Sequence, residues 1–596
     1  MNKQKSLAEN YKCLLKKLDI EESVSGRRVN EVIKKTLGAF CKSHKNPAIW
    51  CYGKHTKMLM MDFIYEMKNV KIIIDTAEKS AVNNGFHIIM PDQIERYKID
   101  GIIISSYVYK EEIKEKILRD HKETDYLDIY EELALNGMIF RSSYFSASHP
   151  CNKYQLINEL QIRYSKTADE NLRKEFLEKI IKEYIIIKDF LNAIKYLKII
   201  ISLEDTKENR EFLAQLTVLY ETEKRMISEM NPESVLMLCI DGFRRKDLLI
   251  GKLPKLWKWI MEHGYFFENA YSSSTSTYES LIPVYGFNNN MKTKYYEREE
   301  LEKEECSFIK EACRQNRKIY FYTDGARYVN CSDIKYSGIS QTATEKIWDF
   351  AIDTSQKGRG LFYLHILYES HYSYSNPYTT TTLVAEGSNI MFDFLETKGG
   401  KLQTNYGKQQ TDALKYIDDI LMPFLELIPC RIVLYADHGN ILMTETDTLR
   451  SIERTKFTCH KDLIEIPLVI KCPELSVQRD KRLISLMELN KMICCLLNDE
   501  KYDYTESEYI KIQRSEIYNP DFCYLYKKNG REKELQAFEL FIFRDGVQLM
   551  IYADGTIEEI MEDGRSVEDK WDRLKCVEEE ITVCSKEDIA NRTRRE

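Results

Sequence analysis

Two apolar segments of this chain end in acidic residues, and both endings carry side chains that could bind a metal. Residues 432–436 form an apolar run that stops at Asp437 and His438, and residues 235–240 form another that stops at Asp241. Side chains at the carboxyl ends of strands in an α/β sheet point into the crevice where ligands bind. Carboxylate and imidazole groups are common ligands of divalent cations. The three side chains therefore predict a divalent-metal site at the ends of two buried strands.

A hydroxyl-rich segment between these two strands supplies a candidate nucleophile. Ser276 and Glu279 have the spacing of a capping box, so we expect a helix to begin with Thr277 as its first residue. The free amides and the positive end of a helix favour an alkoxide and an incoming anionic phosphate. A hydroxyl attacks poorly unless a metal or a base lowers its pKa, and the predicted metal site would do so. Two alternatives stay open: Thr275 is the nucleophile, or the segment is only a polar loop that caps a helix.

Residues 1–150 are expected to form a helical lead-in followed by a small Rossmann-like domain. Apolar strands alternate with helix-forming segments from residue 46 onward, which indicates a parallel sheet. Asp75 lies 22 residues after Gly53, a spacing that suits an acid binding a ribose hydroxyl. Gly53 stands alone, however, where dinucleotide binding requires three glycines. A structural or docking role is therefore favoured over nucleotide binding.

The remaining sequence divides into a helical spacer, a second α/β domain and a short tail. Apolar residues at helical spacing run through residues 151–230, which predicts packed helices between the two α/β domains. Pro232 marks a boundary, because proline ends a preceding helix. The second domain is expected over residues 231–575 and the C-terminal tail over residues 576–596.

The composition excludes several functional classes. With 596 residues, 43% of them hydrophobic and 31% charged, the chain has the composition of a soluble protein with two or more domains. Its formal net charge of −8 predicts no basic surface for nucleic acid. No apolar stretch approaches the roughly 18 residues needed to span a bilayer, and the first residues lack the apolar core of a signal peptide. The 16 cysteines follow no disulfide framework. We therefore expect a cytoplasmic protein with reduced thiols; its oligomeric state stays open.

The order of these segments resembles the alkaline phosphatase superfamily, most closely its sulfatase-like phosphotransferases, which include phosphoethanolamine transferases and lipoteichoic acid synthases. The shared pattern is a strand ending at Asp241, a Ser/Thr loop before a helix, and a strand ending at Asp437 and His438. Further segments match in the same order, namely residues 361–371, 405–419, 460–467 and 543–555. The resemblance spans about residues 232–575. It implies a central mixed sheet flanked by helices.

Carried over residue by residue, the resemblance implies a metal site and a nucleophile. The residues that would surround one divalent ion, Zn²⁺ or Mn²⁺, are Asp241, Thr277, Asp437 and His438. Thr277 would be the attacking residue. The ion would act as a Lewis acid toward phosphate and would activate the threonine. No organic cofactor is implied.

The resemblance also assigns roles to two histidines. His371 and His460 would bind a second metal or the substrate phosphate, and one of them would protonate the leaving group. His365 is an alternative ligand. Lys456 is an alternative in the role of the lysine found in sulfatases.

The activity that the resemblance implies is that of a metal-dependent phosphotransferase or phosphoester hydrolase. A phosphoester donor would phosphorylate Thr277, and the group would pass to a hydroxyl acceptor or to water. Glycans, including surface polysaccharides, are one candidate acceptor class. A second reading is a scaffold or binding protein that keeps the fold without turnover. A third, sulfate-ester hydrolysis, is disfavoured because residues 277–280 lack the cysteine or serine signature that matures to formylglycine.

Overall fold

The structure is a computed structural model that describes most of the chain. The described residues are 3–20, 26–76, 81–83, 86–138, 143–144, 150–287, 300–355, 358–372, 374–379, 401–442, 459–517, 520–560 and 570–585. The chain forms two compact units. The first comprises Met1–Tyr220, Thr323–Ala326 and Ser337–Lys346, and the second comprises Glu221–Tyr322, Arg327–Tyr336 and Ile347–Glu596.

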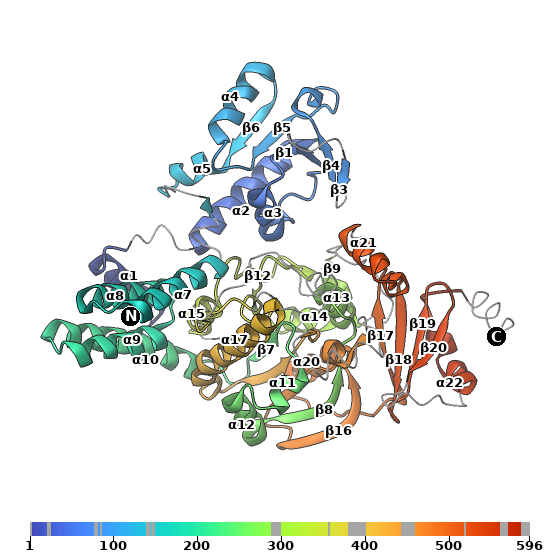
Figure 1. The fold of residues 1–596 in the computed structure, drawn as a ribbon. Coiled ribbons are helices and arrows are strands. Elements are labelled where there is room, and N and C mark those ends of the chain that lie inside the picture. Colours follow the sequence, from blue (N-terminus) through green and yellow to red (C-terminus); the bar gives the residue numbers. More distant parts are fainter. Residues whose placement is uncertain are drawn as a thin grey trace. The chain divides into compact units, whose positions relative to one another are not determined.

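A six-stranded sheet lies in the first unit (Figure 1). Its order is β3-β4-β2-β1-β5-β6, and all neighbours run parallel except β3 and β4. The strands are β1 (Pro47–Trp50), β2 (Ile72–Ile74), β3 (Ala81–Asn83), β4 (Phe86–Ile89), β5 (Gly101–Ile104) and β6 (Asp125–Asp128). The helices are α1 (Lys3–Lys17), α2 (Gly26–Ser43), α3 (Lys54–Phe63), α4 (Lys110–Asp120) and α5 (Ile129–Leu135). The predicted Rossmann-like sheet is confirmed.

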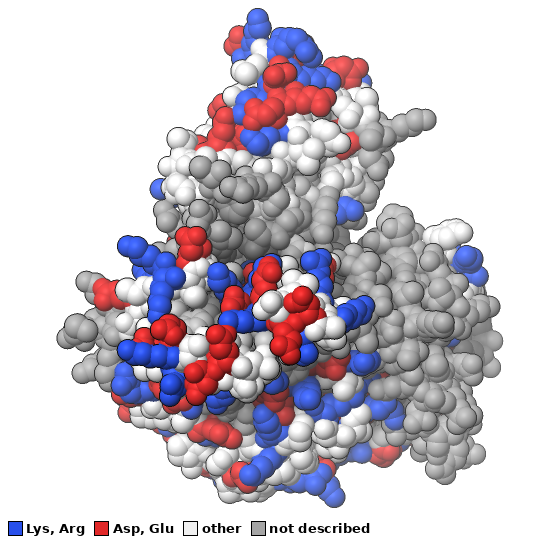
Figure 2. Space-filling model, turned by 60° about the vertical axis from the view of Figure 1, so that its left-hand side comes forward, with Lys and Arg blue, Asp and Glu red and all other residues white. Residues whose placement is uncertain are grey.

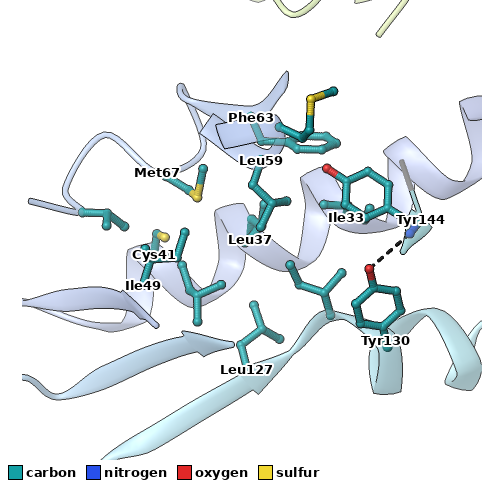
Figure 3. Close-up of a cluster of buried hydrophobic side chains, with 14 of the residues drawn as sticks. Ile33, Leu37, Cys41, Ile49, Leu59, Phe63, Met67, Leu127, Tyr130 and Tyr144 are labelled. Atoms are coloured by element: carbon teal, nitrogen blue, oxygen red, sulfur yellow. Dashed lines mark hydrogen bonds between the residues drawn. The ribbon is translucent and has the colours of Figure 1, made fainter. Parts of the chain in front are cut away.

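The strands of this sheet bury apolar side chains on both faces. Successive residues of a strand point to opposite sides, so each strand contributes to two cores. On one side Ile49 and Leu127 pack with side chains of α2 and α3 (Figure 3). On the other side Ala48 and Trp50 pack with Ile113 of α4. Burial on both faces explains why these strands are continuous apolar runs in the sequence.

Four helices follow the sheet along the chain. They are α7 (Pro150–Lys166), α8 (Glu170–Ile186), α9 (Phe190–Leu203) and α10 (Lys207–Ser228). Helix α8 packs against both α7 and α9. Asp169 and Asp189 begin α8 and α9 by accepting hydrogen bonds from backbone amides of the first turn. These helices occupy the segment predicted as a helical spacer.

An eight-stranded mixed sheet lies in the second unit, and Figure 1 labels its strands β7, β8, β12 and β16. Its order is β12-β10-β13-β7-β14-β15-β8-β16. The strands are β7 (Val235–Ile240), β8 (Tyr265–Tyr271), β10 (Lys318–Tyr322), β12 (Ile334–Ser337), β13 (Gly360–Ile366), β14 (Arg431–Tyr435), β15 (Leu468–Lys471) and β16 (Gln478–Ser485). Strands β10, β13, β7 and β14 run parallel, whereas β15 is antiparallel to both β14 and β8. The predicted central mixed sheet is confirmed.

Helices flank this sheet. They are α11 (Arg245–Leu249), α12 (Pro254–His263), α13 (Thr277–Gly286), α14 (Ser307–Arg314), α15 (Ala343–Thr354), α17 (Lys401–Leu425), α19 (Lys461–Ile464) and α20 (Leu489–Leu497). Helix α20 packs on β7, α14 packs on β10, and α12 packs on β8. No helix within the described residues is long and apolar enough to cross a membrane.

Smaller elements complete the second unit. An antiparallel sheet contains β17 (Tyr509–Arg514), β18 (Phe538–Phe543), β19 (Gln548–Tyr552) and β20 (Ile557–Ile560). Helices α21 (Pro520–Lys528) and α22 (Lys570–Val577) belong to the same part of the chain, and β9 (Leu301–Glu302) pairs with β11 (Val329–Asn330). On the face drawn in Figure 2, Lys and Arg side chains are interspersed with Asp and Glu side chains.

Candidate active site

The carboxyl ends of three neighbouring strands meet at one edge of the large sheet. Strands β13, β7 and β14 are adjacent and parallel, and both outer strands pair with Cys239 of β7, through His365 and Tyr435. Asp241 directly follows β7, and Asp437 lies two residues beyond β14. The same register therefore brings side chains from three distant segments together.

Asp241, Asp437 and His438 form a buried cluster. Each offers a ligand atom, and these atoms all lie within 4.8 Å of one another. Both aspartates are fully buried. Oδ1 of Asp241 and Oδ2 of Asp437 have no hydrogen-bond partner among the described residues. Because buried carboxylate oxygens without partners are costly, two of them facing one imidazole fit the coordination of a cation.

Each acidic loop contains a glycine at a place where the local geometry restricts the residue type. The Gly242 amide donates to Oδ1 of Asp437 at 3.1 Å. Gly242 has a φ of +61°, a conformation that other residues adopt only under strain. A Cβ at Gly439 would lie 2.1 Å from the backbone oxygen of Asp462. Both glycines of the Asp-Gly and Asp-His-Gly sequences are therefore required by the local geometry.

His438 presents one defined nitrogen to the cluster. Its Nδ1 lies 2.6 Å from the backbone oxygen of Gly439, which can only accept, so Nδ1 carries the proton. Nε2 is then the nitrogen with a lone pair, and it lies 3.4 Å from Oδ2 of Asp437. A backbone carbonyl that fixes the tautomer in this way is the usual support for a metal-binding histidine.

Thr277 lies against the same cluster. It is the first residue of α13, as predicted. Its Oγ1 donates to Oδ2 of Asp241 at 3.2 Å and lies 3.4 Å from Nε2 of His438. In the described contacts of this segment, the hydroxyl that reaches the cluster is that of Thr277 rather than that of Thr275.

The start of α13 differs from the predicted capping box. The Ser276 hydroxyl donates to Oε2 of Glu279 at 3.0 Å, and its side chain caps no amide of the helix. The other carboxylate oxygen of Glu279 accepts from the Ser515 amide at 3.0 Å. The predicted capping box is therefore wrong. Glu279 instead contacts Ser515, the residue that follows β17.

The charges of the cluster shift the pKa values of its members. Burial raises the pKa of Asp241, but the imidazole of His371, the hydrogen bond from His365 and the imidazole of His438 outweigh burial and hold that pKa below its usual range. Burial and the charge of Asp241 raise the pKa of Asp437. Burial lowers the pKa of His438, and the two carboxylates overcome this effect and raise it. The site therefore favours positive charge next to its carboxylates.

His365 also lies at this cluster, although the sequence indicated it only as an alternative ligand. Its Nε2 lies 3.2 Å from Oδ2 of Asp241, the side chain is buried, and its ring stacks on Tyr363. The available signal was a histidine inside an otherwise apolar strand. That signal identifies a site only when β13 is known to lie beside β7.

The two histidines implied by the resemblance lie in different surroundings. His371 is half-buried, its Nδ1 donates to the Tyr372 carbonyl at 2.6 Å, and its imidazole lowers the pKa of Asp241. His460 begins α19, where its Nδ1 accepts from the Asp462 amide at 3.1 Å. His460 does not belong to the group whose ligand atoms lie within 4.8 Å, so its role stays a prediction. Lys456 lies outside the described residues.

Parts of this chain are similar to a known family and to solved structures. A family described as C2185-like, N-terminal, matches residues 43–124. The C-terminal periplasmic domain of EcEptC from Escherichia coli is similar in structure, with 16% identity and a TM-score of 0.34 over 45% of this chain and 83% of that one. The phosphonate monoester hydrolase SpPMH from Silicibacter pomeroyi has 12% identity and a TM-score of 0.42 over 61% and 95%. A Vibrio parahaemolyticus protein described as belonging to the alkaline phosphatase superfamily has 12% identity and a TM-score of 0.36 over 58% and 84%.

The structural matches are of the kind that the sequence resemblance implied, namely phosphoethanolamine transferase domains and other proteins of the alkaline phosphatase superfamily. No curated protein matches the chain in sequence. The expected cytoplasmic location is corrected, because the matched transferase domains are periplasmic. That expectation rested on features the sequence lacks, and a missing apolar leader or disulfide framework does not define a compartment.

Proposed function

We propose that the second unit is a metal-dependent phosphotransferase or phosphoester hydrolase in which Thr277 attacks phosphorus. The observation that carries the proposal is the position of the Thr277 hydroxyl, 3.2 Å from Asp241 and 3.4 Å from His438, beside the buried cluster. A threonine at the first position of a helix, next to acceptor groups and a cation-binding cluster, is the arrangement that activates a hydroxyl.

The metal ligands in this proposal are Asp241, Asp437 and His438. Oxygen and nitrogen donors suit Zn²⁺, or Mn²⁺ where carboxylates dominate. The buried oxygens of Asp241 and Asp437 without hydrogen-bond partners support the assignment. When bound, the ion would supply Lewis acidity toward the phosphoryl oxygens and lower the pKa of the attacking hydroxyl.

The chain's own groups manage the protons and the orientation of the reaction. The Thr277 hydroxyl gives its proton to solvent water as the bond from Oγ1 to phosphorus forms and the bond from phosphorus to the leaving oxygen breaks. Asp241 already accepts the hydrogen bond of that hydroxyl, which directs the remaining lone pairs toward an incoming phosphate. His371 is the proposed donor of a proton to the leaving oxygen, because it is half-buried and its imidazole influences the pKa of Asp241.

A second transfer would release the phosphoryl group from Thr277. Water as the acceptor would make the protein a hydrolase, and a hydroxyl acceptor, such as one on a glycan, would make it a transferase. The reaction class common to both is displacement at phosphorus through a threonine-linked intermediate.

Intact-mass analysis of the full chain tests this function. Zinc-loaded or manganese-loaded protein is incubated with p-nitrophenyl phosphate and with bis-p-nitrophenyl phosphate, and product and adduct mass are both followed. We expect turnover and an adduct that peptide mapping assigns to Thr277. Thr277→Ala should lose both, and Thr275→Ala should keep both.

The alternative hypothesis, a scaffold or binding protein without turnover, predicts a different result. A protein that holds no metal and turns over neither compound, with identical behaviour of wild type and Thr277→Ala, would refute the enzyme proposal. An adduct that maps to Thr275 would refute the choice of nucleophile while keeping the reaction class. Release of p-nitrophenol from p-nitrophenyl sulfate alone would favour sulfate-ester hydrolysis.

A further inference from the structure

A second group of potential ligands lies in the same unit, on residues that the proposed reaction does not use. Cys313, Cys331 and Asp333 each offer one ligand atom, and these atoms lie within 4.8 Å of one another. Cys313 is in the last turn of α14, whereas Cys331 and Asp333 belong to the turn between β11 and β12. Both cysteines are free, half-buried thiols. Two segments thus converge on one point near the surface.

The spacing of these atoms matches a tetrahedral metal site. In such a site, with metal–sulfur distances of about 2.3 Å and metal–oxygen distances of about 2.1 Å, a sulfur and an oxygen ligand lie about 3.6 Å apart. Oδ2 of Asp333 lies 3.4 Å from the sulfur of Cys313 and 3.8 Å from that of Cys331. Both sulfur atoms therefore lie near the same carboxylate oxygen, one slightly closer and the other slightly farther than in an ideal tetrahedral site.

We propose that Cys313, Cys331 and Asp333 bind a thiophilic divalent cation of the zinc class, at a site separate from the Asp241 cluster. Two thiolates select Zn²⁺ over Mg²⁺, Ca²⁺ or Mn²⁺, because soft sulfur ligands favour the softer ion. Binding deprotonates both thiols and releases two protons. Asp333 is exposed, so a water molecule can complete the coordination.

Lys303 is the competing positive group at this place. Its ammonium lies 3.1 Å from the same oxygen of Asp333, and it neutralises the carboxylate when no ion is bound. The lysine side chain is partly exposed, so it can move into solvent when a cation takes its position. The proposal therefore predicts that Lys303→Met tightens Zn²⁺ binding.

The site stabilises a segment that reaches the proposed nucleophile. The ring of Tyr328, next to β11, lies 5.3 Å from the ring of Tyr278, and the Tyr278 hydroxyl donates to the Arg327 carbonyl at 3.5 Å. Tyr278 directly follows Thr277. An ion that fixes Cys331 and Asp333 holds the β11–β12 turn, and this turn continues into the residues that pack on Tyr278. The proposed role is structural support.

Cobalt substitution distinguishes this site from the catalytic one. Co²⁺ bound by thiolates gives a near-ultraviolet charge-transfer band, whereas Co²⁺ bound by oxygen and nitrogen does not. The reduced full chain, in a non-thiol reductant, is titrated with Co²⁺ and then with Zn²⁺. We expect one thiolate-bound Co²⁺ per chain that Zn²⁺ displaces.

Substitutions show which residues produce the thiolate band. Cys313→Ser and Cys331→Ser should abolish it, and Asp333→Asn should weaken Zn²⁺ binding about tenfold or more, since even indirect partners of metal ligands contribute that much. Cys472→Ser, which removes another half-buried thiol, should keep the band, and Asp437→Asn should keep it as well.

Three outcomes would overturn the proposal. One is the absence of a thiolate band in the reduced wild type. Another is a band that survives the double replacement of Cys313 and Cys331. The third is a disulfide joining these two cysteines in protein purified without reductant, with no thiolate-bound Co²⁺ after reduction. Loss of p-nitrophenyl phosphate turnover with the band intact would instead concern the catalytic cluster alone.

Discussion

The two sheets of this protein both present buried histidines beyond strand ends, and the histidines differ in how their surroundings satisfy them. In the first unit, His55 is bonded on both nitrogens, to Ser105 at 3.0 Å and to the Tyr130 hydroxyl at 2.7 Å. In the second unit, His438 faces two carboxylates, each with an oxygen that lacks a hydrogen-bond partner among the described residues.

The pKa values of the two histidines are shifted in opposite directions for this reason. Burial lowers the pKa of His55 to about 4, since its partners are neutral hydroxyls and the charge of Asp128 opposes burial only partly. Burial also lowers the pKa of His438, yet the charges of Asp437 and Asp241 raise it. A closed, neutral hydrogen-bond network stabilises a fold, whereas an unbalanced cluster of negative charge requires a cation.

The largest expected effect is on turnover. Asp241→Asn should reduce phosphoester hydrolysis at least about 100-fold, because even partners one shell beyond metal ligands contribute about 10–100-fold. Elemental analysis should show a matching loss of metal from the catalytic cluster. His55→Gln, in the other unit, should retain turnover, and a reversal of these two results would contradict the comparison.

A smaller effect concerns the pH dependence of stability. The unfolded chain binds a proton at His55 near pH 6.5, and the folded chain binds it only near pH 4. The contribution of neutral His55 to the free energy of unfolding is therefore fully present above pH 6.5 and decreases as the pH falls toward 4. The contribution of this buried group reaches about 3 kcal/mol.

Urea unfolding between pH 7 and pH 4, followed by a signal from the first unit, measures this slope. Relative to the wild type, His55→Gln should lose the part of this slope that His55 contributes. The matched control is His87→Gln, which changes an exposed histidine of β4 and should leave the slope intact. An unchanged slope in His55→Gln would show that another group titrates in this window.

The smallest expected effect is a gain in stability, and it concerns the second unit. In metal-stripped protein, Asp437→Asn should raise the thermal unfolding midpoint, since burial and the Asp241 charge both disfavour its ionised form. The gain is expected to be about 1 kcal/mol. Addition of Zn²⁺ should stabilise the wild type more than the variant. A lower midpoint of the stripped variant would mean that Asp437 is structural.

Much of the geometry of the candidate site was predictable because its residues interrupt strong local patterns. Asp241 and Asp437 end apolar runs that can only be buried strands, and Gly242 and Gly439 follow them where the backbone must turn closely. Thr277 begins its helix as predicted. These features depend on neighbours a few residues away, which the sequence displays directly.

Other features depend on contacts between distant segments. His365 reaches Asp241 because β13 pairs with β7, and Glu279 accepts a hydrogen bond from the distant Ser515 amide. The pair Cys313 and Cys331 gave no motif, since α14 and the β11–β12 turn meet only in the folded chain.

The sequence by itself determined the alternation of strands and helices, the acidic ends of two strands and the hydroxyl at the start of α13. Apolar periodicity and glycine placement act over a few residues, so they can be read without coordinates. The strand order, the third strand of the site and the ligand atoms facing one another were decided by the tertiary structure. Strand pairing joins segments more than a hundred residues apart, and no local pattern encodes which strands become neighbours.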